Sequence, residues 1–155
     1  MKPAQPRGLS RRSVEKLLLK VKGNRSAGSR MDFVSRSFLG HSYKINPLIG
    51  AVDIPEIFTV SLNSFDCVTY IETVLALGRA KNVDSFINAL RNIRYEQGTV
   101  EWKRRNHYMT GWIRCNVRAG VLRRVSLADG ASVVKERTLD VVPGLPPVRA
   151  RFSCV

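Results

Sequence analysis

Apolar residues recur at helical spacing in two neighbouring segments near the middle of the chain. The first covers residues 67–78, where a glycine supplies a stop signal and the apolar stripe is Val68, Ile71 and Leu75. In the second, Asn82 is a good N-cap and the apolar positions follow at i, i+3, i+4 and i+7: Phe86, Ala89, Leu90 and Ile93. The pattern predicts two consecutive amphipathic helices.

Shorter helical patterns flank this pair. Ser10 or Ser13 can cap a basic helix that runs through Lys22 to a glycine, and residues 32–38 show helical spacing of their apolar side chains. An aromatic and basic stretch leads into a further helix at about 110–120, which ends at a glycine.

The remaining segments favour loops and strands. Residues 38–50 contain two glycines and a proline and predict an ordered loop, and residues 52–62 predict a short edge strand or extended segment around Pro55. Alternating residues over 121–142 include Asp129-Gly130, a hairpin turn signal, and the end of the chain is again strand-like. Helices and strands together give an α+β class.

Composition places the chain among globular proteins with a strongly basic surface. Its 155 residues are 44% apolar, enough for one domain with a core, and the formal net charge is +14. The charge is concentrated in residues 1–36 and 101–124. Such a surface attracts polyanions such as nucleic acid, anionic lipid or cell-wall polymer, or it is simply a solvated face. Charge alone does not identify the binding partner, which has to be inferred from other features of the sequence.

No segment has the length of a secretory hydrophobic region or of a membrane span. We therefore expect a protein that is cytoplasmic as encoded, with the periplasm as the alternative. Its cysteines, Cys67, Cys115 and Cys154, are widely spaced, and its histidines are His41 and His107. This pattern favours neither a disulfide framework nor a metal site, and we expect no cofactor.

Cys67 lies at the start of the first central helix, in the stretch SFDCVTYIE. With Ser64 as N-cap it would be the third helical residue, where free backbone N–H groups and the helix dipole favour a thiolate. Position alone does not decide its role, because most free cysteines are buried packing residues. A nucleophilic cysteine also needs a base, and either His41 or His107 could supply one.

Four blocks in order along the chain carry a family resemblance: FLG-x-x-Y at 38–43, FDCVTYIE at 65–72, IRY-x-x-G at 93–98 and RNHY-x-x-x-WI-x-x-N at 105–116. Together they resemble the N-acetylmuramoyl-L-alanine amidase-like family, a branch of the NlpC-type, papain-like cell-wall cysteine amidases. The resemblance implies an α+β papain-like fold, with N-terminal helices and the nucleophile helix packed on a small antiparallel sheet. Residues 30–155 would form this domain, after a basic tail and helix at residues 1–29.

The implied activity is hydrolysis of the amide between muramic acid and L-alanine in peptidoglycan or its recycled fragments, with a muramyl peptide as substrate. Cys67 would be the nucleophile and His107 the candidate base. The resemblance also implies side chains that hold sugar and peptide: Tyr43, Arg94, Tyr95, Arg105, Tyr108 and Trp112.

One feature departs from the family pattern. The catalytic histidine of these enzymes usually stands on a strand well downstream of the cysteine, and no histidine follows Trp112. Either His107 is the base, or the domain is incomplete and the protein is an inactive remnant that binds glycan or another polyanion. An incomplete sheet would leave residues from about 125 onward poorly packed or paired with a second copy. Nucleic-acid motifs are absent, so we expect no specific nucleic-acid binding.

Overall fold

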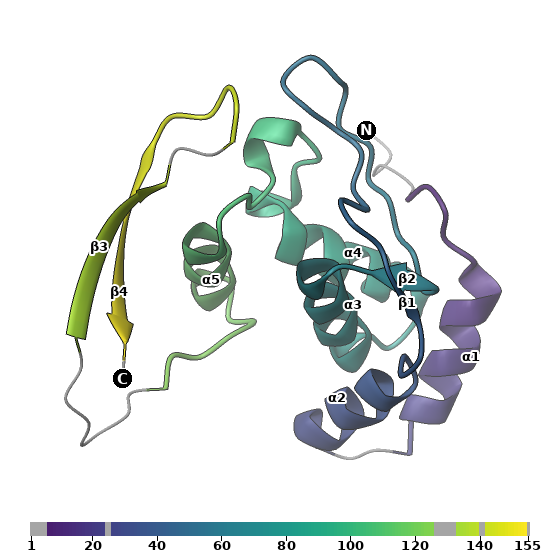
Figure 1. Ribbon diagram of the computed structural model, residues 1–155. Helices are drawn as coiled ribbons and strands as arrows, with labels where there is room; N and C mark the ends of the chain where they lie inside the picture. Colours follow the sequence, from purple (N-terminus) through teal and green to yellow (C-terminus); the bar gives the residue numbers. More distant parts are fainter. Residues whose placement is uncertain (1–5, 24–25, 126–132, 140–141, 155) are drawn as a thin grey trace. The chain divides into compact units, whose positions relative to one another are not determined.

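The computed structural model describes residues 6–23, 26–125, 133–139 and 142–154 (Figure 1). The chain divides into two compact units, residues 1–105 and residues 106–155, and each is described by itself. Within these described residues, the first unit holds four α-helices and a pair of short strands, and the second holds one helix and a hairpin. The structure is therefore a mixed one, of helices with small β-sheets.

Two serine-capped helices open the first unit. The first helix, α1 (Arg11–Val21), begins after Ser10, whose hydroxyl accepts a hydrogen bond from the backbone N–H of Ser13 at 3.3 Å, as the sequence predicts. The second helix, α2 (Ala27–Arg36), begins five residues earlier than the predicted Asp32. The reason is a cap that the apolar spacing does not reveal: a serine at position 26 accepts from the N–H of residue 29 at 3.0 Å.

The two central helices form the core of this unit. They are α3 (Cys67–Arg79) and α4 (Val83–Arg94), and the predicted cap Asn82 accepts a hydrogen bond from the third residue of α4 at 2.8 Å. Their facing sides bury fully several apolar side chains, namely Ala76, Leu77, Phe86 and Leu90. Burial of each larger side chain contributes about 1.5–3 kcal/mol.

Gly78 lies inside α3 and does not end it, contrary to the expectation. A Cβ atom at this position would come within 2.9 Å of the Cγ atom of Met31, a side chain on α2. The glycine thus permits α2 to approach α3 closely. The helix ends one residue later, at Arg79.

The β-structure of the first unit is a parallel pair of two-residue strands, β1 (Ser42–Tyr43) and β2 (Ser64–Phe65). In register, Ser42 faces Ser64, and β2 leads directly into α3, so this pair places residues of the 38–50 loop beside the start of the helix. The strand that α3 contacts here is part of a parallel pair, whereas the family resemblance led us to expect an antiparallel sheet.

Residues 52–62 are extended only in part, because the chain turns at 52–54, where the N–H of Ala51 donates to the carbonyl of Ile54 at 3.0 Å. They form isolated bridges, with Ile57 opposite Ile49 and Thr59 opposite Arg7, and no strand of their own. Two short 3₁₀ helices, η1 (Glu96–Gly98) and η2 (Trp102–Arg104), close the unit.

The second unit contains α5 (Met109–Arg118) and an antiparallel hairpin of β3 (Val133–Leu139) and β4 (Val148–Cys154). The predicted helix at 110–120 is present within one or two residues of its expected limits. The hairpin turn expected at Asp129-Gly130 lies outside the described residues. In the described part, β3 pairs instead with β4, which follows it in the chain.

Two expectations about organisation stay predictions: the boundary between residues 1–29 and 30–155, and the pairing of the C-terminal strands with a second copy. Among the helices of the described residues, none combines the length and the apolar character needed to cross a membrane.

Candidate functional site

Cys67 is the first residue of α3, and its N-cap is Asp66, not Ser64. The Asp66 carboxylate accepts a hydrogen bond from the Thr69 backbone N–H at 2.7 Å, and the Thr69 hydroxyl accepts one from the Asp66 N–H at 3.0 Å. This reciprocal capping box fixes the chain direction at the helix start. It leaves Cys67 exposed in the first turn, where backbone N–H groups have no partner within the helix.

Cys67 lines a cavity of about 260 Å³. The cavity lies between the 38–43 block and the start of α3, and its lining residues are Phe38, His41, Ser42, Tyr43, Phe65, Asp66, Cys67 and Tyr70. The pairing of β1 with β2 is the reason that these two distant segments meet. The exposed cysteine therefore lies in a pocket that is largely aromatic.

His41 lines the same cavity and is held there by aromatic neighbours. Its ring stacks on Phe65, with ring centroids 6.2 Å apart and planes 12° apart, and it contacts Phe38 at 5.5 Å between centroids. Its backbone N–H donates to the carbonyl of Phe38 at 3.1 Å. A thiol and an imidazole in one cavity are the two groups that cysteine nucleophilic catalysis requires.

Tyr70 and Tyr43 complete the aromatic wall in different ways. The hydroxyl of Tyr70 shares a hydrogen bond of 2.9 Å with the hydroxyl of Ser35 on α2, which ties the wall to the helical core. Tyr43, one of the residues expected to hold substrate, has 70% of its surface exposed, and its hydroxyl has no such hydrogen bond to another described residue. It is available to a ligand in the cavity, and its role as a substrate contact stays a prediction.

Arg105 and Tyr95, also expected to hold substrate, meet instead at a buried carboxylate. Arg105 contacts both carboxylate oxygens of Glu56, at 3.1 and 3.0 Å, and the hydroxyl of Tyr95 donates to the same carboxylate at 2.7 Å. Burial and this hydrogen bond raise the pKa of Tyr95 well above its ordinary value of 10.0. Since Tyr95 has no exposed surface, we assign it to the support of the 49–57 segment.

Arg94 forms a buried ion pair with Glu72, and each side chain is only 2% exposed. Its Nε atom donates to the Glu72 carboxylate at 2.7 Å, and its Nη1 atom donates to the backbone carbonyl of Thr59 at 2.6 Å. The guanidinium also lies 5.7 Å from the ring centroid of Phe58. Arg94 thus connects α4 to α3 and to the extended 57–61 segment.

The other predicted site residues belong to the second unit. His107 and Tyr108 are half-buried just before α5, and Trp112 is 4% exposed within that helix. Because each unit is described by itself, their predicted roles beside Cys67 stay predictions. The expected absence of a metal also stays a prediction. In the described ranges, no group of three or more metal-ligating side chains occurs.

Three comparisons with known proteins add to this geometry. A family model described as AmiA-like, N-acetylmuramoyl-L-alanine amidase-like, matches residues 33–140. A search among curated proteins finds no significant match.

Several solved structures are similar to the chain. A Legionella pneumophila protein shares 27% identity at a TM-score of 0.64, over 81% of this chain and 39% of its own. An N-acetylmuramoyl-L-alanine amidase from Bacteroides uniformis shares 27% identity at a TM-score of 0.64, over 74% of this chain and 49% of its own. A Bacteroides fragilis protein described as a candidate xylanase shares 27% identity at a TM-score of 0.61, over 70% of this chain and 48% of its own. The chain thus spans less than half the length of these structures.

Proposed function

The chain belongs to the N-acetylmuramoyl-L-alanine amidase-like family, and from this premise we propose that it is a cysteine amidase that cleaves the bond between muramic acid and L-alanine in peptidoglycan or its recycled fragments. The observation that carries the proposal is the exposed Cys67 at the start of α3, in a cavity that also contains an imidazole. An amidase from Bacteroides uniformis among the similar structures supports the reaction class. We also propose that the chain has the papain-like, NlpC-type fold.

In the proposed reaction, the Cys67 thiolate attacks the carbonyl carbon of the acid group that links muramic acid to L-alanine. In the proposal, free backbone N–H groups in the first turn of α3 stabilise the oxyanion of the tetrahedral intermediate. Collapse of this intermediate breaks the C–N bond, and a histidinium donates its proton to the leaving amine of L-alanine. Water, deprotonated by the same histidine, then hydrolyses the thioester and restores the thiol.

The base is one of two histidines. His107 is the candidate base in the RNHY block of the sequence, and His41 is the histidine that lines the cavity of Cys67. His41 sits on a loop whose position is fixed by β1 and by its contact with Phe65. We propose that either His41 or His107 is the base, and single substitutions of the two histidines decide between them.

A glycosidase activity, as the description of the Bacteroides fragilis structure would suggest, has less support. Most glycosidases need two carboxyl groups that flank the scissile bond. Among the described residues that line the Cys67 cavity, Asp66 is the one with a carboxylate, and that carboxylate is engaged in the helix cap. The cavity therefore suits a thiol mechanism better.

The test is incubation with an anhydromuramyl tripeptide and detection of the free tripeptide by mass spectrometry. We expect turnover by the wild-type protein and a loss on the order of a thousandfold or more in Cys67→Ala. Cys115→Ala is the matched control, since Cys115 belongs to α5 and is not among the residues that line the Cys67 cavity. Equal turnover by wild type and Cys67→Ala would contradict the mechanism, and an inert wild type would favour a binding protein instead.

Histidine substitutions use the same assay. His41→Ala and His107→Ala are compared at several pH values, because loss of the base removes the corresponding limb of the pH profile of kcat/KM. The base is the histidine whose loss abolishes turnover while the folded state persists. If neither substitution has an effect, neither histidine is the base.

A further inference from the structure

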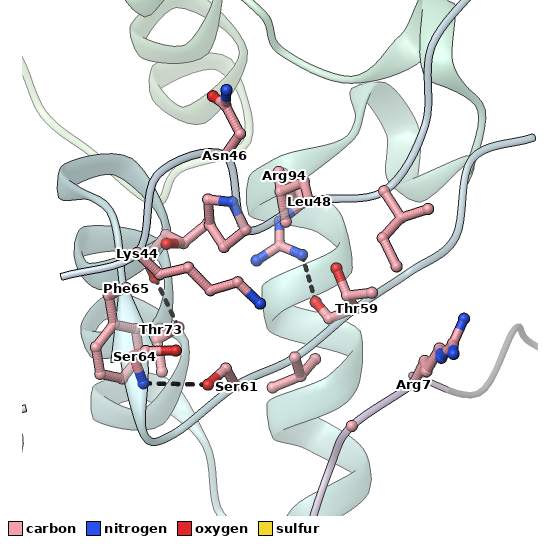
Figure 2. A pocket seen from close by; sticks show the side chains of 15 residues that line it. Arg7, Lys44, Asn46, Leu48, Thr59, Ser61, Ser64, Phe65, Thr73 and Arg94 are labelled. Atoms are coloured by element: carbon pink, nitrogen blue, oxygen red, sulfur yellow. Dashed lines mark hydrogen bonds between the residues drawn. The ribbon is translucent and has the colours of Figure 1, made fainter. Parts of the chain in front are cut away.

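Figure 2 shows a second cavity, of about 360 Å³, which has one lining residue in common with the Cys67 cavity. It is formed by the N-terminal segment at residues 7–8, the loop at 44–49, the extended segment at 59–61 and the first turns of α3. Phe65 lines both cavities, and Thr69 of the α3 capping box lines this one. Phe65 is therefore a wall that the two cavities share.

This cavity is lined by three cationic side chains and, among the described residues, by no carboxylate: Arg7, Lys44 and Arg94. The charge of Arg94 is already balanced by Glu72. Lys44 and Arg7 are exposed, and no ion pair of theirs is found within the described part of the chain. The cavity thus has an excess of positive charge that a ligand can neutralise.

Backbone hydrogen bonds fix the main chain at Lys44 and Arg7. The N–H of Lys44 donates to the carbonyl of Phe65 at 2.9 Å. The N–H of Arg7 donates to the carbonyl of Phe58 at 2.7 Å, and its carbonyl accepts from the N–H of Val60 at 2.9 Å. These bonds fix the points at which the two cationic side chains leave the main chain.

A hydroxyl group without a partner lies in the same wall. The Oγ1 atom of Thr59 is buried, and no residue that the structure describes is a hydrogen-bond partner for it. Buried polar atoms normally have such a partner, which a bound ligand or water can supply. Figure 2 shows the Lys44 side chain extending toward Thr59 and Arg94, with Arg7 standing apart on the neighbouring segment.

We propose that this cavity is an anion subsite that binds a carboxylate of the peptide stem of the substrate, with Lys44 as its main cation; this rests on the proposed function. Charge-assisted hydrogen bonds from Lys and Arg to a carboxylate are strong and directional. The peptide stem of a muramyl peptide carries such carboxylates beyond the L-alanine that is released. The scissile bond would lie at Cys67 and the anionic end of the peptide beside Lys44.

The test measures binding without turnover, in a Cys67→Ala background, by calorimetry. The ligands are muramyl-L-alanyl-D-glutamate and the same compound with its carboxylates converted to amides. We expect the acid to bind about tenfold more tightly than the amide at low salt, and Lys44→Gln to abolish this preference. Lys16→Gln is the matched control, because Lys16 is exposed on α1 and lines neither cavity.

The outcomes separate this inference from the proposed function. Equal affinity for acid and amide, binding of neither, or a preference that survives Lys44→Gln would overturn the subsite. An acid preference that depends on Lys44, in a protein whose wild type cleaves no muramyl peptide, would leave the subsite standing and overturn the amidase proposal. Turnover by the wild type without any preference for the acid would support the amidase proposal and overturn the subsite.

Discussion

At the scale of single residues, Glu56 shows how a buried carboxylate is stabilised. Its side chain is 2% exposed and accepts hydrogen bonds from Tyr95 and Arg105. The arginine balances the charge, and the phenol satisfies one carboxylate oxygen as a neutral donor. Gly50 also belongs to this site, because any Cβ atom there would collide with the Glu56 carboxylate. A buried phenol that donates to a carboxylate resists ionisation.

This resistance predicts a pH effect on stability. Because the pKa of Tyr95 in the folded state is raised above its ordinary value of 10.0, the folded chain keeps this proton where the unfolded chain loses it. The stabilisation is complete below pH 10 and is lost as pH rises further, by up to about 1.4 kcal/mol per pH unit. Urea unfolding at pH 8, 10 and 11 should show this slope in the wild type and a shallower one in Tyr95→Phe. Identical slopes would refute the prediction.

The site was only partly predictable at this scale. The sequence block around Cys67 predicted that this cysteine belongs to the site, but it did not predict the N-cap of the helix. Ser64 and Asp66 are both good N-cap residues, and the backbone conformation, which the sequence does not show, makes Asp66 the cap. The presence of His41 in the cavity depends on the pairing of two-residue strands far apart in sequence. Strands this short leave no alternating pattern that could reveal the pairing.

At the scale of elements, the Arg94–Glu72 pair connects α3 to α4. Removal of one partner leaves an uncompensated buried charge, so Arg94→Ala should lower the free energy of unfolding by about 3–5 kcal/mol. The exposed pair Arg36–Asp32 on α2 is the control, and Arg36→Ala should cost about 0.5 kcal/mol or less. Chemical denaturation of both variants checks the contrast, and a loss of similar size in the two would contradict it.

Helices were more predictable than strands in this chain. The limits of α3 and α4 follow from apolar periodicity and from the Asn82 cap, which are local signals. The start of α2 was missed because its first turn carries no apolar stripe before Met31. The 52–62 segment pairs through isolated bridges with residues 7 and 49, and such long-range pairs follow from the tertiary fold alone.

At the scale of the whole molecule, the net charge of +14 predicts attraction to any polyanion. We expect DNA duplexes of unrelated sequence to bind with equal affinity, and this affinity to fall steeply as salt rises, since it arises from counterion release. Titrations at several salt concentrations by fluorescence anisotropy provide the measurement. A preference for one sequence that persists at high salt would show a specific nucleic-acid function that nothing in the described structure suggests.

The central claim is that Cys67 is the nucleophile, and alkylation by iodoacetamide during an activity assay tests it most directly. Peptide mapping at intervals should show Cys67 modified before Cys115, with activity lost in step with modification of Cys67 alone and both slowed by excess muramyl peptide. Activity that persists after Cys67 is fully modified, or that is lost in step with Cys115, would contradict the account.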